Sequence, residues 1–127
     1  MPTVAEIVEC LDELYPPSWA EPWDAVGLVC GDPDAAVDLV LFAIDPVAAV
    51  AAEAIERGAG LVVTHHPLFL RGVHGVAATT PKGSLVHRLL TNGVALHVAH
   101  ANADVAWPGV SDELAAALRR EPLAPLV

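Results

Sequence analysis

The chain has 127 residues, of which 54% are hydrophobic and 17% charged, and 16 acidic against 6 basic side chains give a net charge of −10 at pH 7. This length and apolar content exclude a disordered coil, and the acidic balance argues against nucleic acid as a direct partner. No apolar block reaches the roughly 18 residues of a membrane-spanning helix. We therefore expect one soluble domain over residues 1–127.

The first predicted element is a helix over residues 4–14. Thr3 and Glu6 have the spacing of a capping box, and apolar residues then recur at helical intervals. Prolines end this helix, and residues 26–29 are predicted to form a short strand after an irregular connection. Glu6 and Glu9 stand where a signal peptide would be basic, so we expect a cytoplasmic protein.

Two further strands are predicted from continuous apolar runs. Residues 39–44 and 61–64 show no alternation, which is typical of strands buried on both faces of a sheet. Asp45 and Pro46 after the first run have the residue types of a helix N-cap and first turn. They predict an alanine-rich helix that ends near Arg57.

The last third of the chain repeats this order of elements. Thr80 and Pro81 predict the start of a helix that ends near Asn92. A third buried strand follows over residues 94–99, and a final helix is predicted over 111–119. Strands that alternate with helices predict an α/β fold with a mainly parallel sheet flanked by helices.

Three features have ordinary structural interpretations. Cys10 and Cys30 lie in apolar stretches without metal-binding spacing, so we expect reduced core thiols. We expect His97 inside its strand to be a core or site-lining residue, and His87 to lie on a helix surface. The long segment 72–83 is either a mobile flap or an ordinary surface loop.

Polar residues follow each buried strand of the predicted sheet. Asp45 ends the first, His65 and His66 end the second, and His100 ends the third, with Asp104 shortly beyond. Ligands bind at the carboxyl ends of strands in open parallel sheets. Taken alone, Asp45 is better explained as an N-cap, but the histidines and Asp104 together predict a metal site.

The two adjacent histidines suit a pair of ions. Side chains of successive strand residues diverge, and Pro67 restrains His66 to an extended backbone, so His65 and His66 would each hold a different ion. Imidazole nitrogen suits zinc, iron and nickel, and a carboxylate from Asp104 suits harder cations such as manganese. The alternative is a hydrogen-bonded cluster of histidines and aspartates without metal.

Several motifs in register resemble one known family. They are residues 64–68 (Thr-His-His-Pro-Leu), 100–106, 108–112 and 23–28, with Asp45 also in place. This pattern is similar to the Nif-three-like proteins, also called GTP cyclohydrolase I type-two homologues. The resemblance covers essentially the whole chain, and it implies the Nif-three-like fold.

The resemblance also implies a dinuclear site. His65 and Asp104 would serve one ion and His66 the other, while His100 would line the site without being a ligand. Members of the family continue into a second half whose His-x-x-x-Glu motif completes the site, so this chain resembles the N-terminal half alone. We therefore expect partial metal occupancy. The family further implies a ring-like hexamer built from dimers.

Two functions follow from these observations. The first is a metal-dependent hydrolase of a small molecule, such as a nucleotide. It would use two divalent transition-metal ions, which could be zinc, iron, manganese or nickel. His100 would be the catalytic residue that orients the substrate or moves a proton. The sequence has no glycine-rich phosphate loop that would support a nucleotide. The alternative is a non-catalytic module for metal binding, assembly or a protein partner.

Overall fold

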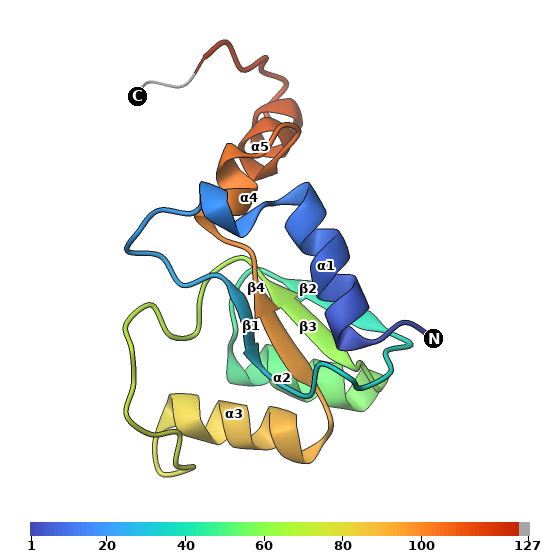
Figure 1. Ribbon diagram of the computed structural model, residues 1–127. Helices are drawn as coiled ribbons and strands as arrows, with labels where there is room; N and C mark the ends of the chain where they lie inside the picture. The colour runs from blue at the N-terminus through green and yellow to red at the C-terminus, as the bar shows by residue number, and fades with distance from the viewer. Residues whose placement is uncertain (125–127) are drawn as a thin grey trace.

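Helices and strands alternate along most of the chain (Figure 1). The computed structural model describes residues 1–124. The elements in chain order are α1 (Val4–Leu14), the 3₁₀ helix η1 (Pro17–Trp19), β1 (Gly27–Cys30), β2 (Val40–Ala43), α2 (Ala48–Arg57), β3 (Leu61–Thr64), α3 (Pro81–Thr91), β4 (Ala95–Val98), α4 (Ala101–Val105) and α5 (Val110–Ala117). This order confirms the predicted α/β class.

The strands form one sheet in the order β1-β4-β3-β2. Strands β2, β3 and β4 are parallel, with Val40 opposite Leu61 and Leu61 opposite Ala95. Strand β1 pairs antiparallel with β4 at one edge. The predicted mainly parallel sheet is thus confirmed. The carboxyl ends of its three parallel strands lie together at one end of the sheet.

Helices cover both faces of the sheet (Figure 1). On one face, α2 and α3 pack against Val62 and Leu96, and on the other, α1 packs against Leu61, Val63 and Ala95. Successive strand residues point to opposite faces, so β3 contributes to both clusters. Burying each such Leu or Val side chain contributes about 1.5–3 kcal/mol. The central strands β3 and β4 are therefore the most firmly held part of the fold.

Two predicted helix starts are confirmed. The Thr3 side chain accepts a hydrogen bond from the Glu6 amide at 3.2 Å, and the Glu6 carboxylate accepts one from the Thr3 amide at 2.8 Å. Thr80 caps α3, with Pro81 as its first residue. Helix α5 begins at Val110, one residue before the predicted start, and helix α4 was not predicted.

The prediction that Asp45 caps α2 is wrong. The N-cap residue is Val47, which makes no side-chain cap, and the helix begins at Ala48. The Asp45 carboxylate instead accepts a hydrogen bond from the imidazole of His66 at 2.7 Å. The Asp-Pro pair has the residue types of a helix start, but a partner from the next strand end holds the aspartate.

The prediction that residues 39–44 are buried on both sides is also wrong. Strand β2 lies at an edge of the sheet, where Phe42 is 69% exposed and Ile44 is 62% exposed. A continuous apolar run indicates hydrophobic contact, but it does not distinguish a central strand from an edge strand. These apolar side chains border a groove described below.

The cysteine prediction holds in part. Both thiols are free, and Cys30 at the end of β1 is half-buried, where burial raises the pKa of its thiol. Cys10 is exposed on α1, so it is not a core thiol. The helix directs Val4 and Leu11 into the core, and residue 10 falls on a different side of the helix from this buried stripe.

The segment between β3 and α3 runs along the outside of the molecule (Figure 1). Residues 71–80 are exposed and form neither helix nor strand. The following helix α3 carries His87 on its exposed side, as predicted. Among the described helices, none has the length and apolar character needed to cross a membrane.

His97 is a buried histidine without hydrogen bonding at one nitrogen. Its side chain in β4 is 1% exposed, which confirms the core position, and its Nδ1 has no hydrogen-bond partner within residues 1–124. Burial lowers the pKa of His97 below its ordinary value of 6.5, although Asp12 on α1 acts in the opposite direction. His97 therefore stays neutral at a pH where an exposed histidine is protonated.

We expect His97→Leu to reduce the loss of stability at acid pH. Below about pH 6.5 the unfolded chain binds a proton at His97 and the folded chain does not, so this residue lowers the free energy of unfolding as pH falls, by up to about 1.4 kcal/mol per pH unit. The loss stops below the pKa of the folded state. Urea unfolding of the parent chain and of His97→Leu at about pH 7 and about pH 5 measures how much unfolding free energy each chain loses. Equal losses in the two chains would refute this assignment.

Candidate metal centre

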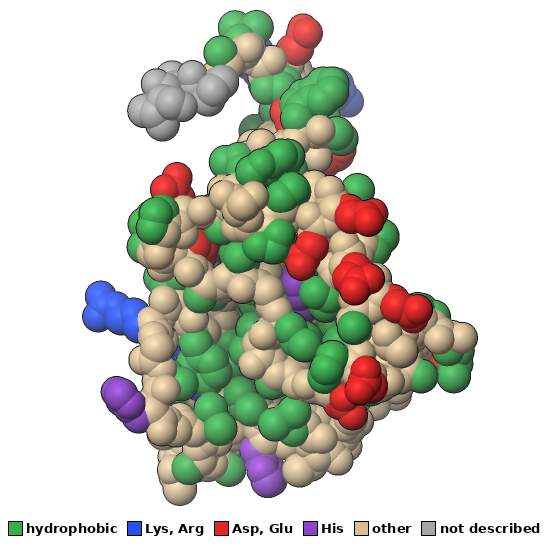
Figure 2. Space-filling model, in the orientation of Figure 1, with side chains coloured by type: hydrophobic (Ala, Val, Ile, Leu, Met, Phe, Trp, Pro, Cys, Tyr) green, Lys and Arg blue, Asp and Glu red, His purple; other side chains and the backbone are tan. Residues whose placement is uncertain are grey.

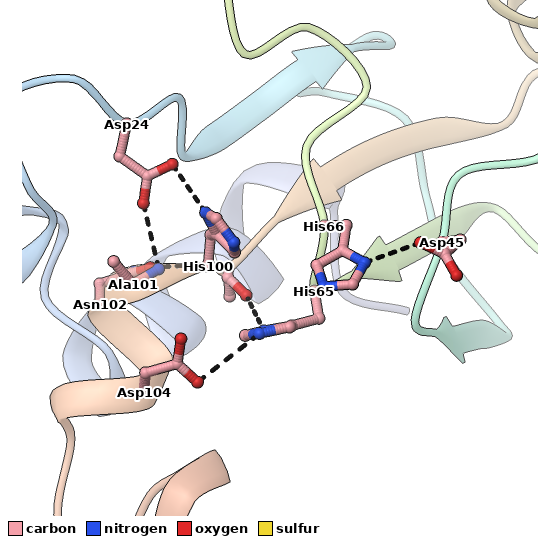
Figure 3. Close-up of polar contacts among 9 residues, drawn as sticks. Asp24, Asp45, His65, His66, His100, Ala101, Asn102 and Asp104 are labelled. Carbon is pink, nitrogen blue, oxygen red and sulfur yellow. Dashed lines mark hydrogen bonds and ion pairs between the residues drawn. The ribbon is translucent and has the colours of Figure 1, made fainter.

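The ends of the parallel strands bring together residues that are far apart in the sequence. Asp45 follows β2, His65 and His66 follow β3, and His100 follows β4 (Figure 3). The short helix α4 begins directly after His100 and carries Asp104 back toward His65. The strand ends therefore form the cluster that the sequence predicted.

His65 is held by the backbone of the neighbouring strand end. Its Nδ1 lies 3.0 Å from the carbonyl oxygen of Ala99, which can only accept, so Nδ1 carries the hydrogen and donates it. In the neutral ring, Nε2 then has a free lone pair. It lies 3.6 Å from Oδ1 of Asp104, which is too long for a hydrogen bond. Two electron-rich atoms thus face each other across a short gap.

That gap has the size of a metal-bridged pair. Zinc binds imidazole nitrogen at about 2.0–2.1 Å and carboxylate oxygen at about 2.0–2.2 Å. An ion at these distances from both atoms would make an angle of about 120° across the 3.6 Å separation, close to the tetrahedral angle that zinc prefers. The donor types and their spacing therefore fit a divalent transition metal.

His66 is oriented by a carboxylate in the same way. Its Nδ1 lies 2.7 Å from Oδ1 of Asp45, and both side chains are about half exposed. The hydroxyl of Thr64 donates to the His66 carbonyl oxygen at 3.0 Å, which fixes the chain where it leaves β3. A carboxylate on Nδ1 leaves Nε2 without a hydrogen and raises the basicity of the ring as a ligand.

His100 completes the set of oriented imidazoles. Its Nδ1 lies 2.8 Å from Oδ1 of Asp24, whose side chain is fully buried. Burial raises the pKa of the Asp24 carboxyl, but hydrogen bonds from His100 and from the amides of Ala25 and Ala101 outweigh burial and hold the pKa below its ordinary value of 3.8. Asp24 is therefore an ionised acceptor at neutral pH.

The three rings converge on one space. The ring centroid of His65 lies 5.2 Å from that of His66 and 5.2 Å from that of His100. The centroids of His66 and His100 are 5.8 Å apart. One nitrogen from each ring lies within 4.8 Å of one nitrogen of each other ring. His65 and His66 do not diverge as a regular strand would require, because both lie beyond the end of β3.

The predicted site residues are thus brought together with two differences. His65 lies against Asp104, as the predicted sharing of one ion requires, and His66 is nearby. His100, predicted only to line the site, is as close to His65 as His66 is. Asp24 was given no role, although its place in the Trp23-Asp24 motif was the signal that could have identified it.

An apolar groove of about 360 Å³ lies beside this centre. Its lining residues come mainly from α1, from the ends of β2 and β3 and from the start of α5, and they include His65. Its walls include Leu11, Tyr15, Phe42 and Val110. A polar cluster beside an apolar groove is a common arrangement for a small-molecule site.

Sequence comparisons identify relatives over nearly the whole chain. Residues 2–127 match the family model described as Duf34/NIF3 (NGG1p interacting factor 3). A Streptomyces coelicolor protein named GTP cyclohydrolase 1 type 2 homolog is 57% identical over all of this chain, which covers 45% of that protein. A Mycobacterium tuberculosis protein of the same name is 56% identical over 91% of this chain, covering 30% of that protein. The chain thus spans less than half the length of these relatives.

Solved structures show the same fold. The Bacillus cereus protein related to NIF3 matches with a TM-score of 0.88 and 34% identity over 94% of this chain and 33% of its own. Reduced HcgD from Methanocaldococcus jannaschii matches with a TM-score of 0.88 and 28% identity over 98% of this chain and 50% of its own. The match to the family model and these shared folds confirm the resemblance seen in the motifs, and this chain belongs to the Duf34/NIF3 family.

Proposed function

We propose that this chain binds divalent transition-metal ions through His65, His66 and Asp104 and acts in metal-dependent hydrolysis of a small molecule. One observation carries the proposal: each of three converging imidazoles donates Nδ1–H to an oxygen acceptor, which leaves Nε2 of each ring free to bind an ion or to accept a proton. Zinc, iron, manganese and nickel all suit this donor set.

The chemistry divides between the ions and the chain. Two ions bound side by side would lower the pKa of a water toward neutrality and polarise the bond to be broken. His65 and Asp104 would hold one ion and His66 the other, with Asp45 orienting His66. His100 would accept a proton at Nε2 or orient the substrate. The adjoining groove would receive an apolar part of the ligand.

The set of ligands from this chain is small for two ions. We propose that, in the longer relatives, residues from the part that this chain does not cover complete the coordination, or that water does so. The 127-residue chain alone would then bind metal with partial occupancy. The relatives' name, GTP cyclohydrolase 1 type 2 homolog, makes a guanine nucleotide the first substrate to test.

The charge of the chain bears on an anionic substrate. The net charge is −10, and acidic side chains gather over the side of the molecule where α1 lies (Figure 2). A nucleotide would be repelled by this field unless bound cations reversed it locally. Nucleotide binding, if it occurs, should therefore depend on metal.

Metal analysis combined with a substrate panel tests this function. The chain is purified without chelator, reconstituted with zinc, manganese, iron or nickel, and assayed on GTP, phosphoesters and amides. We expect bound metal below two ions per chain and hydrolysis that a chelator abolishes. Absence of both metal binding and hydrolysis would refute the proposal.

A non-catalytic module for assembly or for a protein partner is the second candidate. The exposed apolar side chains Phe42 and Ile44 beside the groove favour it, because exposed apolar patches mark interaction surfaces. Bound metal without hydrolysis of any panel member, together with self-association measured by light scattering, would support this candidate over the hydrolase. The homo-oligomer expected from the family stays a prediction.

A further inference from the structure

We infer that Asp24 is the positioning residue of His100: its buried carboxylate holds the ring as the Nδ1–H tautomer and turns a bare Nε2 toward His65 and His66. The tautomer follows from the contacts of the Asp24 carboxylate and does not depend on bound metal. The use made of Nε2, as a proton acceptor in hydrolysis, rests on the proposed function.

The carboxylate of Asp24 is fixed by hydrogen bonds at both oxygens. Oδ1 accepts from the amide of Ala25 at 2.8 Å and lies 2.8 Å from Nδ1 of His100, and Oδ2 accepts from the amide of Ala101 at 3.1 Å. The side chain is fully buried. An ionised carboxylate has no hydrogen to give, so the hydrogen between Asp24 and His100 belongs to Nδ1.

The backbone of His100 is held by a further hydrogen bond. The backbone amide of His100 donates to Oδ1 of Asn102 at 2.9 Å, and the side-chain Nδ2 of Asn102 donates to the backbone carbonyl of Tyr15 at 2.8 Å. The ring of Trp23 lies edge-on to the imidazole, with 6.3 Å between the ring centroids. The backbone of His100 is thus fixed through Asn102 and its ring through Asp24, and Figure 3 shows the ring between Asp24 and the other two histidines.

This arrangement determines what His100 can do. A neutral ring with hydrogen on Nδ1 can only accept at Nε2. In hydrolysis, the oxygen of the attacking water would form a bond to the reacting centre of the substrate while Nε2 takes one of its protons. The bond from that centre to the leaving group would then break, and the leaving group would take the same proton from Nε2. A buried carboxylate on Nδ1 stabilises the imidazolium between these two steps.

Nitrogen-15 NMR of the imidazole rings tests the tautomer directly. The experiment uses uniformly labelled, metal-free chain above the pH at which exposed histidines titrate, so its result does not depend on metal binding or hydrolysis. We expect His100 to show a protonated, pyrrole-type Nδ1 and a bare, pyridine-type Nε2. A hydrogen on Nε2, or averaging between the two forms, would overturn the inference.

Two variants separate positioning from simple support of the fold. Asp24→Ala removes the acceptor, so the His100 proton should redistribute and the Nε2 signal should move toward the pyrrole type. Asp24→Asn can keep an oxygen against Nδ1 and should preserve the wild-type pattern. Asp45→Ala is the matched control, since it removes the partner of His66 and should leave the His100 signals unchanged.

The variants also have an outcome that counts against the inference. An unchanged His100 tautomer in a folded Asp24→Ala chain would show that Asp24 does not set it. If Asp24→Ala does not fold, the wild-type spectrum and that of Asp24→Asn still decide the question. A correct tautomer in a chain that binds no metal would refute the proposed function and leave the role of Asp24 intact.

Discussion

A His65→Ala chain should bind zinc at least about 100-fold more weakly than the parent chain. Loss of an outer partner of a ligand typically lowers metal affinity about 10–100-fold, and this change removes a predicted ligand itself. The Nε2 of His65 is the atom that faces Asp104 across 3.6 Å, so Asp104→Ala should have a similar effect. Competition with a chromophoric chelator measures the zinc affinity of each variant and of the parent chain.

His87→Ala provides the matched control for this experiment. It also removes one imidazole, but from the exposed side of α3, and should leave zinc affinity unchanged. Circular dichroism of each variant shows whether the fold is retained. Equal zinc affinity in the parent, His65→Ala and Asp104→Ala chains would mean that the cluster is a hydrogen-bonded network without metal.

A large effect on stability should come from Gly31→Ala, which we expect to lower the free energy of unfolding by roughly 3 kcal/mol. Gly31 follows β1 and has a φ of 119°, which residues with a Cβ rarely adopt. A Cβ there would lie 2.4 Å from Cβ of Ala95, where β1 pairs with β4. The energetic costs of backbone strain and of this close contact would therefore add.

Two other glycines separate these contributions. Gly58, the left-handed C-cap of α2, has a φ of 70° and open space around it, so Gly58→Ala should show the cost of backbone strain alone, about 1 kcal/mol. Gly72 has neither strain nor close neighbours, and Gly72→Ala should be nearly neutral. Urea unfolding of the three variants measures the differences. A Gly31→Ala chain no less stable than Gly58→Ala would contradict the close packing of β1 on β4.

The elements with strong local signals could be predicted from the sequence. The capping box of Thr3 and Glu6 and the Thr80-Pro81 pair placed α1 and α3, because a cap depends on residues within one turn. The buried runs at 61–64 and 94–99 indicated β3 and β4 for a related reason. Strands covered by helices on both faces are buried at every position, and these two are apolar apart from Thr64 and His97.

Features set by distant partners could not be predicted in this way. Nothing local states that β1 runs antiparallel, or that β2 lies at an edge with Phe42 exposed. Asp45 was assigned to a helix cap because its competing partner, His66, lies 21 positions away in the chain. The carboxylate of Asp24 reaches His100 over 76 positions.

The candidate site was more predictable than these details. The rule that ligands gather at the carboxyl ends of parallel strands placed His65, His66, His100 and Asp104 together without knowledge of any contact. The structure adds the orientation of the rings, which depends on acceptors supplied by Ala99, Asp45 and Asp24. The pattern of residues thus predicts where the cluster lies, whereas the tautomers of its three histidines follow only from the folded structure.

Anomalous diffraction at the zinc edge, from crystals of this chain soaked in zinc, tests the central claim most directly. The proposed metal centre predicts a peak about 2.0–2.2 Å from both Nε2 of His65 and Oδ1 of Asp104, with further density near Nε2 of His66. No peak at saturating zinc, with the two atoms still 3.6 Å apart, would contradict it.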